Sequence, residues 1–199
     1  MTDCPPSGGD GIDGHGTDGG GTDENGSPTA TLVRIVESAA DVAIDPESAT
    51  TTVVGRDGDR DREAGRDGDP GPEARLPPLL ADAESIVGVV PRIDRELSDR
   101  LIDAGSAELN ARIVLTGRAR RRLTGPVRSV VRSRLADRGV DFYTHDGDSP
   151  VGVLLVDDRA VVGLFDDRGL AAVLLADDPA IREWVAKTCR RYLDAAEPL

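Results

Sequence analysis

The stretch "PVGVLLVDDRAVVGLFDDRGLAAVLLADDP", Pro150 to Pro179, contains three apolar runs, and each run ends in a pair of aspartates. The interpretation of these pairs, as corners of a sheet or as a chemical site, decides the fold. The runs, over 151–156, 160–165 and 170–175, have the length of strands, and their short joints predict hairpins. We therefore interpret the aspartate pairs as turns and a helix cap rather than as a metal or acid/base cluster. Successive hairpin corners lie at opposite ends of a sheet, whereas a metal site needs its ligands to converge.

The last pair, Asp178 with the proline that follows it, predicts the start of a closing helix. Aspartate caps a helix N-terminus well, and proline suits the first helical position. The apolar residues that follow recur at helical spacing and predict one buried stripe. That stripe consists of Ile181, Trp184, Val185, Thr188, Cys189 and Tyr192.

Upstream, from Leu76 onward, apolar strand-like runs alternate with amphipathic helical segments. The expected helices cover 76–84, 93–104 and 126–139, and the expected strands cover 85–90, 111–116 and 140–145. Strand–helix–strand units produce parallel strands, and hairpins produce antiparallel ones. The predicted fold class is therefore α/β, with a mixed sheet flanked by helices, whose early strands are parallel and whose late strands are antiparallel.

The rest of the chain predicts the domain organisation. Residues 1–28 are rich in Gly and Asp and should form a disordered acidic tail. Residues 29–49 contain a short helix, interpreted as a linker remnant, and 50–196 form the α/β domain, beginning with the strand "TTTVV". The segment 55–75, rich in Gly, Pro and charged residues, is expected to be a mobile acidic loop inserted in that domain.

The composition limits the possible partners. The 199 residues carry a net charge of -13, and Lys187 is the only lysine. Such acidity opposes nonspecific binding to nucleic acid and membranes at ordinary salt, yet it also suits a protein kept soluble in concentrated salt, where charge is screened. Cys4 and Cys189 indicate no disulfide framework. The sequence shows no signal peptide and no membrane-spanning run, so we expect a cytoplasmic protein.

Two features outside the aspartate pairs carry possible chemistry. The stretch 117–134 is basic, and the expected helix that begins within it carries arginines at i, i+4 spacing on one face. That face could bind phosphate, face solvent, or dock an acidic partner. The arginine pairs are Arg128 with Arg132 and Arg134 with Arg138. His145 ends a strand beside Asp146 and Asp148, but no serine elbow or phosphate loop accompanies it. We expect no catalytic residue, no metal and no cofactor.

Several segments together resemble a known family. They are "VGVVP", "RIVLT", "GVDFYTH", "SPVGVLLVDDRAVVGLFDDRGLAAVL" and "DDPAIREWVAKTCRRYLDAA". The chain resembles the C-terminal sensor domain of archaeal winged-helix transcriptional regulators, above all the middle domain of the methanogenesis regulator FilR, and more distantly the sugar-responsive TrmB-type regulators. Val185 stands where that family usually has a small residue. The residues that match its motifs are Pro150, Gly152, Asp157, Asp158 and Gly163, then Asp178, Pro179 and Trp184.

The resemblance implies a phospholipase-D-like half-fold and a non-catalytic, ligand-sensing and dimerising domain that acts in transcription control. Active phospholipases carry an HxK motif, but "SPVGVLLVDD" has neither residue, so a hydrolase is the weaker alternative. The roughly twenty residues before Thr50 are too few for a winged helix. We therefore expect a stand-alone sensor domain or a coding start upstream of Met1, and an adaptor that pairs with full-length regulators is a further alternative.

We expect the effector to bind where early strands end. The predicted site residues are Pro91, Arg92, Thr116 and His145, and an arginine beside a histidine suits an acidic small molecule. The expected protein partner is a second copy or a winged-helix regulator. We expect no membrane binding, and no specific DNA binding by this chain alone, because it shows no exposed recognition helix followed by a wing.

Overall fold

The computed structural model describes residues 26–46, 48–56, 71–93, 109–123, 133, 136–137 and 139–199. The helices expected over 93–104 and 126–139 lie almost entirely outside the described residues. Arg128, Arg132, Arg134, Arg138 and Cys4 also lie outside them.

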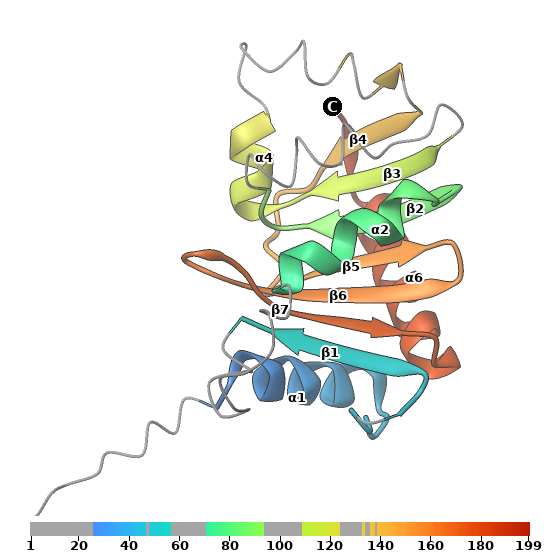
Figure 1. The fold of residues 1–199 in the computed structure, drawn as a ribbon. Coiled ribbons are helices and arrows are strands. Elements are labelled where there is room, and N and C mark those ends of the chain that lie inside the picture. Colours follow the sequence, from blue (N-terminus) through green and yellow to red (C-terminus); the bar gives the residue numbers. More distant parts are fainter. Residues whose placement is uncertain are drawn as a thin grey trace, which may run out of the picture.

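The described strands form one mixed sheet of eight strands in the order β1-β7-β6-β5-β2-β3-β4-β8 (Figure 1). Strands β2, β3 and β4 run parallel to one another, and all other neighbours are antiparallel. The predicted fold class is therefore confirmed. The strands are β1 (Thr51–Gly55), β2 (Ser85–Val90), β3 (Asn110–Leu115), β4 (Val140–Thr144), β5 (Val151–Val156), β6 (Arg159–Asp166), β7 (Gly169–Ala176) and β8 (Glu197–Pro198).

Helices cover both faces of this sheet. On one face, α1 and α6 pack against the strands and against each other, and on the other face η1 and α2 cover the first half of β2 and its neighbours (Figure 1). The seven-residue helix α4 follows β3 directly. The helices are α1 (Pro28–Ala40), the 3-10 helix η1 (Pro72–Arg75), α2 (Leu76–Ala81), α4 (Gly117–Leu123) and α6 (Pro179–Asp194).

The helix α1 belongs to the hydrophobic core. Its Leu32 and Val36 are completely buried and lie in the same cluster as Leu174 of β7 and Ile181 of α6. The segment 29–49, expected as a linker remnant, thus supplies a helix that packs on the sheet. Its N-cap is Ser27, whose hydroxyl accepts a hydrogen bond from the amide of Ala30.

Some elements differ from those expected. Residues 72–75, expected to end a mobile loop, form η1, whose Pro72 is buried. The helix α4 and the two-residue strand β8 were not predicted at all. Both are too short for hydrophobic periodicity to reveal them, since a pattern needs more than one or two turns to be recognised.

The closing helix α6 forms as predicted. The carboxylate of Asp178 accepts hydrogen bonds from the amides of Ala180, at 2.8 Å, and Ile181, at 3.1 Å, and Pro179 occupies the first turn. Of the predicted stripe, Ile181, Val185 and Cys189 are buried, and Trp184 and Tyr192 pack partly against the core.

Cys189 behaves as the buried hydrophobe that the sequence indicated. It is 1% exposed, and burial raises the pKa of its thiol to about 12, so the nucleophilic thiolate is absent at neutral pH. Among the described helices, none has the length and apolar character needed to cross a membrane.

Candidate functional site

The carboxyl ends of the three parallel strands meet at one edge of the sheet, so the backbones of the predicted effector residues lie at neighbouring strand ends. The amide of Thr116 donates to the carbonyl of Val90 at 3.1 Å, and the amide of His145 donates to that of Leu115 at 3.0 Å. These bonds hold the ends of β2, β3 and β4 side by side. Pro91 and Arg92 follow β2, Thr116 follows β3, and His145 follows β4.

Thr116 is the unusual member of this group. Its side chain is 0% exposed, and its Oγ1 has no hydrogen-bond partner in the described part of the chain. A buried hydroxyl without a partner costs about 1–3 kcal/mol relative to one that is satisfied. A polar atom from a bound molecule would remove that cost.

Arg92 already holds part of the fold. Its guanidinium donates to the carbonyl of Asp166 and, at 2.9 Å, to the carbonyl of Asp167, so it fastens the β6–β7 turn to the end of β2. An arginine has five N–H donors in a planar fork. Arg92 is therefore a positioned cation with donors left for a further contact.

His145 links the β4–β5 loop to α6. Its Nδ1 accepts a hydrogen bond from the amide of Gly147 at 2.8 Å, and its ring stands edge-on to that of Tyr192, with ring centroids 4.9 Å apart. The hydroxyl of Tyr192 donates to the carbonyl of Asp148 at 3.4 Å. Since Nδ1 accepts, the neutral ring carries its proton on Nε2, which is the atom available as a donor.

The sequence did not single out the contact between α4 and the β4–β5 loop. Gly117 has φ of 46°, and a side chain there would place its Cβ 2.5 Å from Oδ1 of Asp148. Beside it, Arg120 forms an ion pair with Asp146. The only signal in the sequence was the glycine directly after a strand, which is typical of a turn into a helix and not of a site.

The motif aspartates of the β5–β6 turn lie at the opposite edge of the sheet. Asp157 has φ of 48°, and its carboxylate accepts hydrogen bonds from the amides of Ser85, at 2.8 Å, and Glu84, at 3.2 Å. Asp158 pairs with Arg182 at 2.9 Å. These aspartates therefore hold a turn in place.

The pair after β7 has the same structural character. Asp177 takes two hydrogen bonds from Arg159, at 2.8 and 2.7 Å, and this bonding holds the pKa of the Asp177 carboxyl below its ordinary value. Its neighbour Asp178 caps α6. In the described ranges no three His, Cys, Asp or Glu side chains are arranged to hold a metal ion.

The motif glycines have a packing role next to the predicted effector site. Gly152 of β5 is paired with Gly163 of β6, and the ring of Phe165 lies over both. A Cβ at residue 152 would lie 3.0 Å from that ring and 3.4 Å from Pro91, and a Cβ at residue 163 would lie 2.9 Å from Leu170 and 3.5 Å from the ring. The glycines therefore leave room for the side chains of Phe165 and Leu170 to pack against the two strands. Pro150, the first motif residue, precedes β5 and is exposed.

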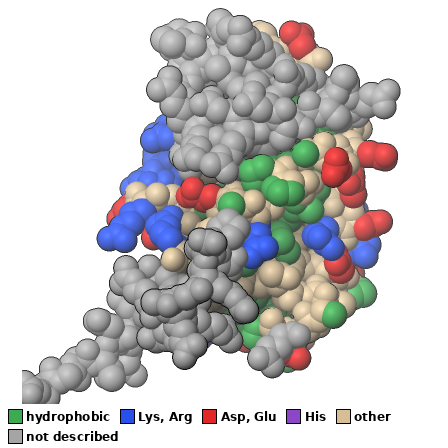
Figure 2. All heavy atoms as spheres, in the orientation of Figure 1, with side chains coloured by type: hydrophobic (Ala, Val, Ile, Leu, Met, Phe, Trp, Pro, Cys, Tyr) green, Lys and Arg blue, Asp and Glu red, His purple; other side chains and the backbone are tan. Residues whose placement is uncertain are grey.

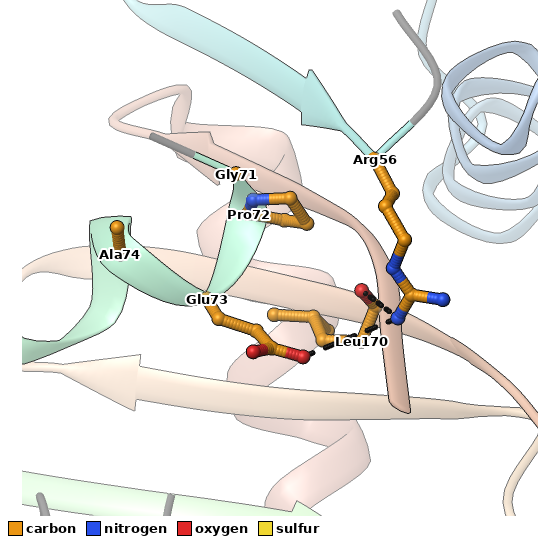
Figure 3. Close-up of a pocket in the computed structure, with 6 residues that line it drawn as sticks. All are labelled: Arg56, Gly71, Pro72, Glu73, Ala74 and Leu170. Carbon is orange, nitrogen blue, oxygen red and sulfur yellow. Dashed lines mark hydrogen bonds and ion pairs between the residues drawn. The ribbon is translucent and has the colours of Figure 1, made fainter. Parts of the chain in front are cut away.

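A hollow of about 240 Å³ lies elsewhere, between β1, η1 and the start of β7. Figure 3 shows Arg56 and Glu73 on either side of Leu170. The guanidinium of Arg56 donates to both carboxylate oxygens of Asp166 at 3.0 Å, and to the carbonyl of Leu170 at 2.6 Å. The carboxylate of Asp166 already neutralises the charge of Arg56. We therefore interpret Arg56 as a residue that stabilises the fold rather than as one that binds a ligand.

Another hollow, of about 250 Å³, lies between β4 and the C-terminal residues. Phe142 and Tyr143 form one wall, and Pro198 and Leu199 form the other. Neither hollow is lined by the four predicted effector residues.

Comparison with known proteins identifies the family. The sequence pattern of the family described as "Methanogenesis regulatory protein FilR1, middle domain" matches residues 72–195. The chain belongs to this family. The resemblance inferred from the motifs is thus confirmed, and the matched range contains all four predicted effector residues. No curated protein matches the chain.

Solved structures show that the FilR1 middle domain has a phospholipase-D-like fold here. TrmBL2, an archaeal chromatin protein, is 17% identical with a TM-score of 0.54, over 83% of this chain and 60% of that chain. The phospholipase D family member Nuc from Salmonella typhimurium is 15% identical with a TM-score of 0.55, over 75% and 97% of the two chains. NucT from Helicobacter pylori is 12% identical with a TM-score of 0.51, over 63% and 89%. At such identities the likeness establishes the fold alone.

Proposed function

We propose that this FilR1-type middle domain is a non-catalytic effector-sensing and dimerising part of a transcription regulator. Membership of the family places the chain among transcription-regulator domains. The observation that supports effector sensing is the buried, unpartnered hydroxyl of Thr116, at the edge where parallel strands end. Ligands of open α/β sheets bind at that edge. We further propose that the domain works in the cytoplasm of a salt-adapted cell, where its acidic surface keeps it soluble.

The proposed effector is a small anion with a hydroxyl or carbonyl group for Thr116. Arg92 supplies a positioned cation, and His145 supplies a donor on Nε2. Because Thr116 is 0% exposed, the effector reaches it only if a neighbouring element moves. We propose that this element is α4, a seven-residue helix that directly follows Thr116 and contributes Ala119 to a small buried cluster.

Thr116→Val tests the effector site. Without effector, the variant should be as stable as the parent or up to about 1 kcal/mol more stable, because a methyl replaces an unsatisfied hydroxyl. With effector, its affinity should fall roughly tenfold, equivalent to about 1.4 kcal/mol. Isothermal titration against citrate, malate, sugar phosphates and nucleoside monophosphates, followed by thermal unfolding, measures both quantities.

Thr51→Val is the matched control, because Thr51 is also buried but lies in β1. It should leave effector affinity unchanged. If none of these anions releases heat with the parent protein, or if Thr116→Val binds as tightly as the parent, the effector site is not where we place it.

Dimerisation through the free edge of β1 is the second part of the proposal. In the described part of the chain β1 is the last strand on its side of the sheet. The amide of Arg56 donates to the carbonyl of Ala171, and the amide of Asp177 donates to the carbonyl of Thr50. The backbone groups of even-numbered residues along β1 therefore point toward β7. Because this direction alternates along a strand, the amide of Val53 points away from the sheet. Exposed edge strands pair readily with another chain.

Sedimentation velocity tests this interface. The 20.9 kDa chain should sediment as a dimer, and Val53→Pro, which removes the outward amide, should sediment as a monomer. A parent protein that stays monomeric across concentrations, but co-purifies with a winged-helix regulator, would favour the adaptor alternative instead.

A further inference from the structure

The charges of this acidic chain are distributed unequally between the two edges at which the strands end. Figure 2 shows basic side chains gathered on the left of the view and acidic ones, with fewer basic ones, on the right. At the edge where β2, β3 and β4 end, six arginines stand beside four aspartates: Arg92, Arg118, Arg120, Arg121, Arg122 and Arg168, with Asp146, Asp148, Asp166 and Asp167. At the opposite edge, six acidic residues stand beside two arginines: Asp82, Glu84, Asp157, Asp158, Asp177 and Asp178, with Arg159 and Arg182.

Three of these arginines have guanidinium groups available for a partner. Arg121 and Arg168 are exposed and have no side-chain partner among the described residues. Arg118, with a side chain 59% exposed, only approaches Asp167 at 3.6 Å, and Asp167 is itself 96% exposed. Such an exposed pair is worth little and is easily exchanged for another anion. The remaining arginines of this edge are bonded to Asp146 or to backbone carbonyls.

The three available arginines form a row. Arg118 and Arg121 are three residues apart on α4, which places them on one side of the helix, about 4.5 Å apart along its axis. Ala119, completely buried, fixes the helix with this side outward. The approach of Arg118 to Asp167 puts the β6–β7 turn beside the start of α4, so Arg168 extends the row.

We propose that Arg118, Arg121 and Arg168 form a contact surface for the phosphate backbone of duplex DNA. Guanidinium groups match phosphate in geometry and bind it with paired hydrogen bonds. Backbone phosphates repeat about every 3.4 Å of axis along each strand, a spacing that long arginine side chains can follow. The acidic groups at the opposite edge then face away from the duplex, and at the contacting edge the arginines outnumber the aspartates, so the negative net charge does not prevent the contact.

We choose DNA rather than an acidic protein as the partner, because the chain is a transcription-regulator domain and such regulators act on duplex DNA. The contacts reach phosphates and no base edges, so this surface adds affinity and orientation without sequence preference. The proposal goes beyond the effector site and uses none of its four residues.

Fluorescence anisotropy with a duplex of arbitrary sequence, titrated over a range of salt concentrations, tests the proposal on the full chain. The triple variant Arg118→Gln, Arg121→Gln, Arg168→Gln should bind at least about tenfold more weakly at low salt. Its plot of log affinity against log salt should be shallower by about 2 to 3, since three phosphate contacts are lost. Circular dichroism at each salt concentration checks that both proteins are folded.

A second triple variant removes the same charge elsewhere: Arg34→Gln, Arg112→Gln, Arg190→Gln, all exposed and away from this edge. It should keep most of the affinity and the full salt slope. The proposal is overturned if the parent protein does not bind duplex at low salt, if both triple variants lose affinity equally, or if polyglutamate binds as tightly as duplex at equal charge concentration. Thr116→Val should bind duplex normally, so failure of the effector site and failure of this surface are distinguishable.

Discussion

Replacing Gly139 by alanine is expected to destabilise the domain by about 3 kcal/mol or more. Gly139 has φ of 77°, a conformation that costs a residue with a side chain about 1–2 kcal/mol. A Cβ at this position would also lie 1.9 Å from the carbonyl oxygen of Leu109. That oxygen belongs to the backbone just before β3, and the carbonyl of Gly139 accepts a bond from Ala111 at 2.9 Å, so neither segment can move aside freely.

Urea unfolding followed by far-UV circular dichroism measures this loss. Gly71→Ala is the matched control, because a Cβ there would meet nothing within 4 Å and no positive φ is involved. The control should be neutral or stabilising by up to about 1 kcal/mol, since alanine restricts the unfolded chain. Equal unfolding midpoints for the two variants would mean that β3 and β4 do not approach each other as described.

Leu32→Ala is expected to cost about 2–5 kcal/mol, the range found for truncating a fully buried leucine. Leu32 is 0% exposed and packs with Val36, Leu174 and Ile181 between α1, the sheet and α6. The cavity would open where α1 and α6 meet β7, the second strand from one side of the described sheet. Thermal and urea unfolding should both show the loss as one cooperative transition.

Ser38→Ala on the exposed side of α1 provides the control, with an expected change within about 0.5 kcal/mol. This pair of variants tests where the folded unit begins. The proposal that α1 is an integral part of the domain fails if Leu32→Ala costs no more than Ser38→Ala, which is the result expected of a linker.

Local patterns in the sequence were sufficient for most elements but not for their order. The three runs of Pro150 to Pro179 predicted β5, β6 and β7 because hairpin strands need only local information. The insertion of β2 beside β5, and the pairing of β1 with β7, depend on contacts between segments far apart in the chain. No periodicity encodes those choices.

The candidate site was predictable only in part, for the same reason. Parallel strands must end at one edge, so the positions of Pro91, Thr116 and His145 followed from the alternation of strands and helices. The engagement of Arg92 with the carbonyls of the β6–β7 turn did not follow, because it requires the place of that hairpin in the sheet. The missing partner of the Thr116 hydroxyl is visible only once every neighbour is placed.

The position of β1 has a practical consequence for protein engineering. The family pattern begins at residue 72, but β1 and α1 precede it and cover the edge and one face of β7. A chimera with a DNA-binding domain fused directly to residue 72 would lack β1, the neighbour of β7. The amides and carbonyls of β7 that now bond to β1 would then have no partner. Such an edge polymerises by adding strands from other chains. The safe fusion point lies before Ser27, the N-cap of α1, so that the grafted module is followed by the complete α1 and β1 and the sheet that they cover.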